Sequence, residues 1–397
     1  MSPIYLDYQA TTPLAPEGAE AMRPWLDDKF ANPHSPHRLG REAAAAIEVA
    51  REQVVRALNQ TAPRRRPEPS GADDREPGLR RGAALGKLHF TSGATEALNW
   101  ALKGALTRLP PQRRRIVTLA TEHAAVLDTA EWLGRMGAEV DVLQVGRDGV
   151  VDLDLAAGHI RQDTGIVAAM LVNNEVGVIQ PVAALAEIAR ARGALFLCDA
   201  VQGFGRMPLP LEACDLVAIS AHKVHGPKGI GALWVRDGVE LDPLLHGGGQ
   251  EGGVRSGTLS PSLCAGFGAA ARLLVDRADQ DRDHVSRLFA VARQLTVDWT
   301  LNGSETHRYP GNLNIRRSGV DAARLISDVR RVAFSAGSAC ASGSGRPSHV
   351  LRAIGLSDAE ARSSIRLGFG RTTAEEELVE AITLINQAAE RQLSLAA

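Results

Sequence analysis

Seven short apolar runs, most of them separated by helical segments, fill the middle of this 397-residue chain. They lie at residues 88–90, 116–120, 139–145, 166–172, 194–199, 215–220 and 231–236. Apolar runs of this length, bounded by turn residues, are typical of buried strands, and their alternation with helices is typical of a parallel sheet. We therefore expect an α/β fold with a seven-stranded, mostly parallel sheet. Right-handed crossovers should place helices on both of its faces.

The same pattern predicts two domains of unequal size. Residues 15–260 would form the large domain, and residues 1–14 together with 261–397 would form a smaller α/β domain. Residues 61–87 interrupt the large domain, because Pro, Gly, Arg and Asp dominate there and almost nothing can be buried. Such a composition predicts a flexible surface insertion.

Charge and composition exclude several classes of protein. The 45 basic and 46 acidic residues nearly balance, which gives no reason to expect a nucleic-acid or membrane partner. The amino-terminal segment has no signal-peptide pattern, and no apolar run approaches membrane-spanning length. The four cysteines lack CxxC spacing, so neither a zinc site nor a disulfide framework is expected, and a reducing cytoplasm fits best. His34 and His37 are separated by Pro36, which indicates a loop, and no metal site is predicted.

Two polar residues stand at the ends of predicted neighbouring strands. The run 215–220 leads to Lys223 in a Gly/Pro-rich loop, and the run 194–199 ends in Asp199. Chemistry in open α/β sheets gathers at the carboxyl ends of strands. An amine and an acid there suit pyridoxal phosphate, because the amine binds the aldehyde as a Schiff base and the carboxylate keeps the pyridine nitrogen protonated. Lys228 is the alternative lysine, but its glycine loop favours a solvated role.

A candidate anion site lies at the start of a predicted helix. The string Gly93-Ala94-Thr95-Glu96 follows the first strand of the series. The main-chain N–H groups and the Thr95 hydroxyl would face an anion at the positive end of the helix dipole. The string is neither a Walker A motif nor GxGxxG, which weakens a nucleotide-binding interpretation. Taken alone, Gly-Ala-Thr is more often a plain helix start.

Five strings of this chain have a combined pattern that is highly specific. They are Phe90-Thr-Ser-Gly-Ala-Thr-Glu96, Thr121-Glu-His123, Asp199-Ala-Val-Gln202, Ser220-Ala-His222-Lys223 and Gly337-Ser-Ala-Cys340. Together they resemble the cysteine desulfurases of the NifS/IscS type, which are class V aminotransferases of pyridoxal phosphate fold type I. The resemblance extends from Tyr5 to about Arg371, nearly the whole chain.

The resemblance implies pyridoxal 5'-phosphate as cofactor, with Lys223 as its Schiff-base lysine and Asp199 at the ring nitrogen. His123 would stack on the ring and move protons, although a lone histidine is usually structural. Asp199 has a simple helix cap as its alternative role, and Asn173 is the alternative to Asn174. The remaining implied cofactor contacts are Gln202 and Asn174 at the ring oxygen, Ala94, Thr95, Ser220 and His222 at the phosphate, and Thr258 from the second subunit of a homodimer. The family usually has a basic residue where Gly252 stands.

The resemblance also implies L-cysteine as the substrate. Arg366 would grip its carboxylate through the planar guanidinium fork, helped by Asn32 and Asn174. Cys340 stands in a small, polar, glycine-rich segment, whereas the other three cysteines stand in apolar contexts. The implied reaction leaves L-alanine and a persulfide on Cys340 for transfer to a sulfur-acceptor protein, such as an iron–sulfur scaffold. The acceptor and the pathway, whether clusters or tRNA thiolation, stay open.

Two other classes of function compete with this interpretation. Another class V aminotransferase or a selenocysteine lyase would share the cofactor site but would not need a nucleophilic loop cysteine. A non-catalytic sulfur-relay or scaffold protein would be expected to have lost Lys223 or His123, and both are present. The string around Cys340 and the presence of these two residues favour the desulfurase.

Overall fold

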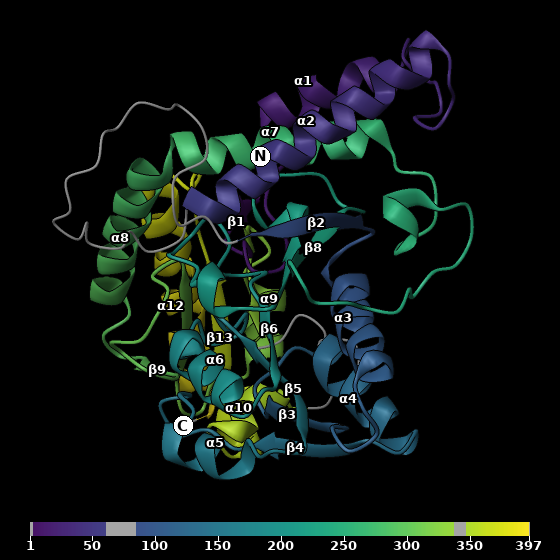
Figure 1. Ribbon diagram of the computed structural model, residues 1–397. Coiled ribbons are helices and arrows are strands. Elements are labelled where there is room, and N and C mark those ends of the chain that lie inside the picture. The colour runs from purple at the N-terminus through teal and green to yellow at the C-terminus, as the bar shows by residue number, and fades with distance from the viewer. Residues whose placement is uncertain (1–2, 61–84, 337–346, 397) are drawn as a thin grey trace, which may run out of the picture.

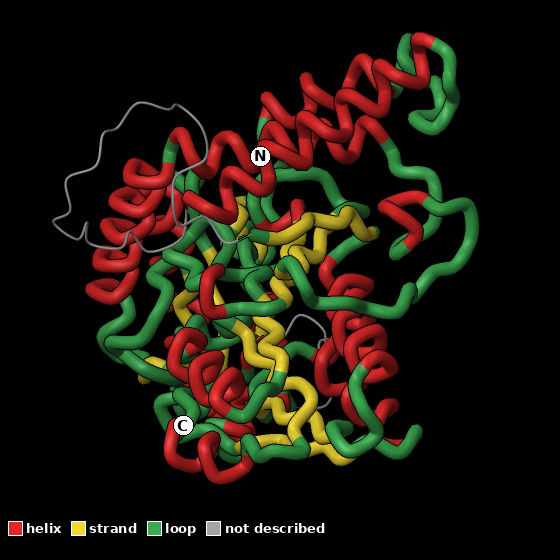
Figure 2. Tube along the Cα trace, in the orientation of Figure 1, coloured by secondary structure: helices red, strands yellow, loops and turns green. Residues whose placement is uncertain are grey.

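A seven-stranded sheet forms the centre of the computed structural model, which describes residues 3–60, 85–336 and 347–396 (Figures 1 and 2). The strand order is β2-β8-β7-β6-β5-β3-β4. Strands β3 to β7 run parallel, and β8 is antiparallel to both of its neighbours, β7 and β2. This confirms the predicted mostly parallel sheet. The bounds are β2 Gly86–Thr91, β3 Arg115–Leu119, β4 Glu139–Leu143, β5 Thr164–Met170, β6 Leu195–Asp199, β7 Leu216–Ser220 and β8 Gly231–Arg236.

Both faces of the sheet are buried, which explains why its strands read as continuous apolar runs. Alternate residues of β5 point to opposite faces: Ile166 packs with one hydrophobic cluster, and Val167 with another. Helices α3 (Ala94–Arg108) and α4 (Ala124–Arg135) cover the first face, and α6 (Val182–Ala191) covers the second (Figure 1). Helix α5 (Leu153–His159) packs against α6 and β4.

The predicted insertion at 61–87 is too long at its carboxyl end. Its residues 61–84 lie outside the described residues, but Gly86 and Lys87 belong to β2 and pair with Arg236 and Val235 of β8. Main-chain pairing requires no apolar side chain, so the strand begins before the apolar run does. A Cβ on Gly86 would lie 2.5 Å from the Trp234 ring, so this close approach requires glycine.

Two smaller sheets lie beside the central one. Strands β1 (Ile4–Tyr5) and β11 (Val332–Ala333) pair in parallel, and a four-stranded sheet has the order β12-β13-β10-β9. One hydrophobic cluster includes residues of the central and four-stranded sheets, and the predicted domain division stays a prediction. The remaining bounds of this part are β9 Thr300–Leu301, β10 Asn312–Arg316, β12 Ser335–Ala336, β13 Ser364–Gly368, α8 Ala278–Leu295, α9 Ala322–Asp328, α10 His349–Ala353, α11 Asp358–Arg362 and α12 Glu375–Ala396.

Three helices pack together at the top of the molecule as drawn in Figure 1. They are α1 (Pro16–Met22), α2 (Arg38–Gln60) and α7 (Pro261–Asp276), with the short helix η1 (Arg23–Trp25) after α1. Gly268 of α7 allows a close crossing, since a Cβ there would lie 2.7 Å from the Cα atom of Ala50.

The free edge of β2 is capped by a buried ion pair. Arg51 of α2 donates a hydrogen bond to the Leu88 carbonyl (2.6 Å), and the Glu251 carboxylate accepts one from the Phe90 N–H (3.1 Å). The guanidinium and carboxylate also bond each other twice, at 2.8 Å. Glu251 lies in η4 (Gln250–Gly253), so the pair satisfies the edge and anchors the segment after β8.

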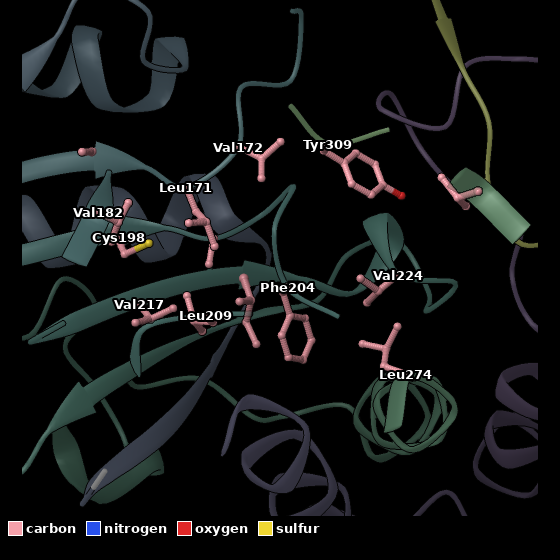
Figure 3. Packing of buried hydrophobic residues seen from close by; sticks show 14 of the residues in the cluster. Leu171, Val172, Val182, Cys198, Phe204, Leu209, Val217, Val224, Leu274 and Tyr309 are labelled. Carbon is pink, nitrogen blue, oxygen red and sulfur yellow. The ribbon is translucent and has the colours of Figure 1, made fainter. Parts of the chain in front are cut away.

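Three of the four cysteines are free and buried: Cys198, Cys214 and Cys264. Figure 3 shows Cys198 near Val182 and Leu171 in the hydrophobic core. A hydrogen bond with Cys214, burial and nearby carboxylates raise the pKa of the Cys198 thiol well above its usual range. Burial likewise raises the pKa of Cys264 to about 12. Thiols in this state are poor nucleophiles. In the described part of the chain, no helix has the length and apolar character needed to cross a membrane.

Candidate active site

Lys223 lies at the carboxyl end of β7, at the last position of the short helix η3 (Ala221–Lys223). Its Nζ atom donates hydrogen bonds to the main-chain carbonyls of Gln9 (2.5 Å) and Ala10 (2.9 Å). Burial, followed by the charges of Arg206 and Arg366, lowers the pKa of Lys223 to about 8. The amine is therefore much easier to deprotonate than an ordinary lysine. Lys228, the alternative lysine, is exposed.

Asp199 is the last residue of β6, the strand beside β7. Its buried side chain accepts a hydrogen bond from the Val201 N–H at 2.9 Å. Burial raises the pKa of Asp199, whereas the Val201 N–H, His123 and Lys223 act to lower it. The structure thus brings Asp199, Lys223 and His123 close enough for electrostatic interaction. A positively charged ring nitrogen would add the counter-charge that favours the carboxylate form.

A second buried carboxyl group, that of Glu122, lies close enough to Asp199 for an electrostatic interaction. Glu122 Oε1 accepts a hydrogen bond from the N–H of Met170 (2.8 Å), and Met170 pairs with Asp199 between β5 and β6. The other oxygen, Oε2, is buried without a hydrogen-bond partner. Burial and the charge of Asp199 raise the pKa of Glu122 well above its usual range, which favours its protonated form. Sequence reasoning missed it, although it stands inside the string Thr121-Glu-His123.

His123 is the residue before α4 and caps its amino end. The Nδ1 atom accepts a hydrogen bond from the Ala125 N–H at 3.1 Å. Because Nδ1 is the acceptor, the proton of the neutral ring is assigned to Nε2. The cap therefore fixes both the orientation and the tautomer of the imidazole.

The amino end of α3 is an open cradle. No side chain caps it, and a Cβ built on Gly93 would meet nothing within 4 Å. Ala94 and Thr95 form the first turn, where main-chain N–H groups lack partners within the helix. Gly231 of β8 allows the main chain of Gly93 to lie close to the sheet, since a Cβ on Gly231 would lie 2.8 Å from it.

Ser220 and His222 are brought near this cradle by the end of β7. Ser220 pairs with Gly231, which contacts Gly93, and His222 lies in η3. His222 Nδ1 is 3.2 Å from the Thr11 hydroxyl. Burial, Lys223, Lys228 and Arg206 lower the pKa of His222 to about 4. An uncapped helix end, open space beside Gly93 and a hydroxyl nearby fit a phosphate group.

The structure separates the two candidate asparagines. The Asn173 side chain is fully buried; its Oδ1 accepts hydrogen bonds from the N–H groups of Glu175 (2.8 Å) and Val176 (2.9 Å), and its Nδ2 bonds the Thr121 carbonyl (2.8 Å). These bonds make Asn173 a structural residue, which leaves Asn174 as the candidate.

Gln202 is buried, and its Nε2 donates a hydrogen bond to the Gln9 carbonyl at 2.9 Å. The same carbonyl accepts the shorter bond from Lys223, so the two predicted cofactor residues share an acceptor. Gln202 therefore lies beside Lys223, and its role at the ring oxygen stays a prediction.

Arg366 is almost wholly buried, with 1% of its surface exposed, in the middle of β13. Its Nη2 bonds the Asp7 carboxylate (2.6 Å) and the Ser335 hydroxyl (3.3 Å), and its Nη1 bonds the Asn174 carbonyl (3.0 Å). Nε is buried without a partner. Three hydrogen bonds thus hold the guanidinium, while its Nε–H has no partner. Asp7 was not predicted, because its partner is 359 residues away in the chain.

Cys340 lies outside the described residues, but the residues on either side of that gap are well anchored. Ser335 donates a hydrogen bond to Asp7 (2.8 Å), and Ser348 donates one to Glu175. The His349 ring bonds the Glu122 carbonyl at 2.9 Å. The chain therefore leaves and re-enters the described structure beside Arg366 and beside the strand end that carries His123. Burial raises the pKa of Glu175 to about 7, while Ser348 and Arg366 lower it.

Two predicted residues are not brought to the site within one chain. Asn32 is exposed in the loop before α2, where its Oδ1 accepts a hydrogen bond from the His34 N–H (2.9 Å). Thr258 is exposed between η4 and α7. Their assigned roles stay predictions.

The sequence model of the family described as "Aminotransferase class-V" matches residues 4–65 and 82–381. The chain belongs to this family. The unmatched residues 66–81 fall within the predicted insertion. "Cysteine desulfurase IscS" of Rickettsia bellii (strain OSU 85-389) is 41% identical over 393 residues, which cover 96% of this chain and 90% of the relative. The protein of the same name from Rickettsia rickettsii (strain Iowa) is equally similar, at 41% with the same coverage.

Solved structures agree with this assignment. A "NifS-like protein" superposes with a TM-score of 0.86 at 30% identity and covers 98% of this chain and 100% of that one. A structure described as "SspA in complex with cysteine" has a TM-score of 0.76 at 32% identity, covering 92% and 98%. DndA from Streptomyces lividans has a TM-score of 0.73 at 33% identity, covering 91% and 98%.

These comparisons confirm the predicted family, fold type and enzyme class, and the cofactor of the family is pyridoxal phosphate. The residues present fit that cofactor. A deprotonatable lysine, a buried acid on the adjacent strand and an open helix end are arranged around the carboxyl edge of one sheet.

Proposed function

We propose that this protein is a pyridoxal phosphate-dependent cysteine desulfurase that converts L-cysteine to L-alanine and leaves a persulfide on Cys340. The carrying observation is the pair Lys223 and Asp199 at the ends of adjacent parallel strands, with the pKa of Lys223 lowered to about 8. Similarity to proteins named cysteine desulfurase favours this function over another aminotransferase, a selenocysteine lyase or a non-catalytic relay protein.

The cofactor would be held at both ends. Lys223 would bind its aldehyde carbon, Asp199 would face the ring nitrogen, and the open end of α3 would receive the phosphate. His123, Gln202 and Asn174 complete the proposed contacts, with Ser220 and His222 at the phosphate. When bound, the cofactor supplies an electron sink for the charge that develops at the substrate α-carbon.

Arg366 would orient the substrate. Its guanidinium is fixed by Asp7 and the Asn174 carbonyl, and its unpartnered Nε–H is available to the carboxylate of L-cysteine. A guanidinium whose position is already fixed loses little freedom on binding. Lys223 Nζ would accept the α-proton, because a pKa of about 8 leaves about a tenth of the amine uncharged at pH 7, far more than for an ordinary lysine.

The sulfur step would belong to Cys340. Its thiolate attacks the substrate Sγ atom, so an S–S bond forms and the substrate C–S bond breaks. The electron pair of that bond stays on the substrate carbon, which is then protonated to give L-alanine. His123 and Lys223 would donate this proton. Support comes from the anchoring of Ser335 and Ser348 on either side of the segment that contains Cys340, next to Asp7 and Glu175.

The test is desulfuration by the purified wild-type protein and three variants. We expect a cofactor absorption band, equal amounts of alanine and transferred sulfur, and loss of persulfide in Cys340→Ala. Cys264→Ala is the matched control, because that thiol is buried and should be inert. Desulfuration that survives Cys340→Ala would remove the nucleophile and favour a lyase of another type. A Lys223→Ala variant that keeps its activity would remove the proposed base.

We also infer a cytoplasmic homodimer in which Thr258 reaches the phosphate of the partner's site. Support comes from the exposed Thr258 at the end of an anchored segment. Mixing inactive Thr258→Ala and Lys223→Ala chains tests this arrangement, because a mixed dimer would regain one intact site. No regain after subunit exchange would contradict it. The sulfur acceptor, such as an iron–sulfur scaffold, would be a separate protein, and the persulfide is the group it would receive.

A further inference from the structure

A partly buried cation without an acidic partner in the described part of the chain lies beside Lys223. Arg206 is in the turn that follows β6, and its side chain is largely enclosed. None of the ion pairs found in the described part of the chain includes it. Its guanidinium lies 5.5 Å from the centre of the Tyr309 ring, and Figure 3 shows Tyr309 among the core residues. Buried charges are normally paired, so an enclosed arginine with no carboxylate needs a functional explanation.

Arg206 holds two residues of the proposed cofactor site. Its Nη2 donates a hydrogen bond to the main-chain carbonyl of Lys223 at 2.5 Å, and its Nη1 donates one to Gln202 Oε1. Because arginine has only donors, the side-chain oxygen of Gln202 must face it. The Gln202 amide nitrogen must then face the opposite way, where it bonds the same Gln9 carbonyl as Lys223 Nζ does.

We propose that Arg206 is a positioning residue of the reaction: it fixes the Gln202 amide and the Lys223 main chain and places an uncompensated positive charge beside the Lys223 amine. This inference rests on the proposed function, in which Lys223 binds the cofactor and accepts the α-proton. Arg206 would act through Gln202 and Lys223 and would not contact the substrate itself.

The charges around Lys223 support the proposal that Arg206 acts on the Lys223 amine electrostatically. After burial, Arg206 is the largest cause that lowers the pKa of Lys223, and Arg366 is the next, whereas Asp7 and Asp199 raise it. Arg366 is paired with Asp7 at 2.6 Å, so its charge is largely balanced. Arg206 has no such partner.

The titratable side chains near Arg206 and Lys223 do not supply the negative charge that Arg206 lacks. Burial raises the pKa of Tyr309, which is therefore neutral beside Arg206. His222 has its pKa lowered to about 4, chiefly by burial, and is neutral at physiological pH. Tyr8 is the other titratable ring whose electrostatic interaction affects the pKa of Arg206, which it raises. Loss of the Arg206 charge should consequently raise the pKa of the Lys223 nitrogen.

The experiment compares the cofactor-loaded wild type with Arg206→Met and Arg206→Lys. The absorption of the lysine-bound cofactor is titrated from about pH 6 to pH 10, since it reports protonation of the Lys223 nitrogen. We expect Arg206→Met to move the midpoint upward by about one pH unit, which lowers the unprotonated fraction roughly tenfold well below the midpoint. The acid limb of kcat/KM should move by the same amount.

Arg206→Lys separates charge from geometry. It keeps the positive charge, so the midpoint should stay near that of the wild type. It loses the fork that holds Gln202, so the Kd for pyridoxal phosphate should rise about tenfold. The control is Arg236→Met, because Arg236 also bonds carbonyl groups and lies near an aromatic ring but is absent from the charges that act on Lys223.

Two results would overturn the inference: an unchanged midpoint in a folded Arg206→Met variant, or an unchanged cofactor Kd in Arg206→Lys. If Arg206→Met does not fold, the midpoint and Kd of Arg206→Lys decide. Failure of the proposed function would look different, because the wild type itself would then form no lysine-bound cofactor and release no alanine.

Discussion

Replacing Glu251 by glutamine tests how firmly the buried ion pair anchors the segment after β8. Burial alone would raise the pKa of Glu251, but hydrogen bonds from His89 and Arg51 and the Arg51 charge lower it from 4.5 to about 2. A difference of this size corresponds to about 3 kcal/mol of folding free energy at neutral pH. For a chain of this length, that energy lowers the thermal midpoint by about 4 °C.

The sign of the pH dependence follows from the lowered pKa. The stabilisation is fully present above about pH 4.5 and is lost as the pH falls through about 2, because protonation removes the charge. Thermal unfolding of Glu251→Gln and of wild type should therefore differ most near neutral pH and converge in acid. Glu48→Gln is the matched control: Glu48 also bonds Arg51, but 62% of its side chain is exposed, so about 0.5 kcal/mol or less is expected. Equal effects of the two variants at pH 7 would refute this reasoning.

Three further predictions concern the site. Arg366→Lys should raise the KM for L-cysteine at least about tenfold with a smaller change in kcat, because a lysine cannot reproduce the fork held by Asp7. Steady-state kinetics checks this, at a temperature where thermal unfolding shows the variant to be folded. Gly93→Ala should leave the thermal midpoint of unfolding almost unchanged but weaken pyridoxal phosphate binding about tenfold, because the added methyl group fills the cradle. Gly231→Ala should lower both the thermal midpoint and the affinity for the cofactor, because its methyl group would clash with the main chain of Gly93. Calorimetry and cofactor titration measure the two quantities. The desulfuration rate at saturating L-cysteine should rise with pH to a plateau, with a midpoint at about 8, the pKa of Lys223. A rate that stays constant from about pH 6 to about pH 9 would contradict the role of Lys223 as the base.

The central sheet was predictable because its strands are buried on both faces. Each predicted apolar run coincides with one of β2 to β8, with ends that differ by a few residues. Lys223 and Asp199 could be paired in advance because they end consecutive strands, and consecutive strands are often neighbours. The start of β2 was missed because Gly86 and Lys87 enter the sheet through main-chain bonds alone.

The supporting residues of the site were not predictable from local patterns. Asp7 meets Arg366 across nearly the whole chain, and nothing in its own neighbourhood indicates that contact. Glu122 stands inside a recognisable string and Arg206 follows another, and only their contacts within the fold distinguish them from surface charges. These contacts depend on the packing of distant elements, which a periodic pattern does not encode.

Gly231 has a practical consequence for attempts to alter which anion the helix end accepts. The shape of that opening is set by a residue on the sheet's antiparallel strand, whose missing side chain lets Gly93 sit where it does. A mutant library confined to the groups expected to contact the phosphate would leave this constraint untouched. Redesign should therefore consider positions 93 and 231 together, since a side chain at 231 would displace the main chain of Gly93.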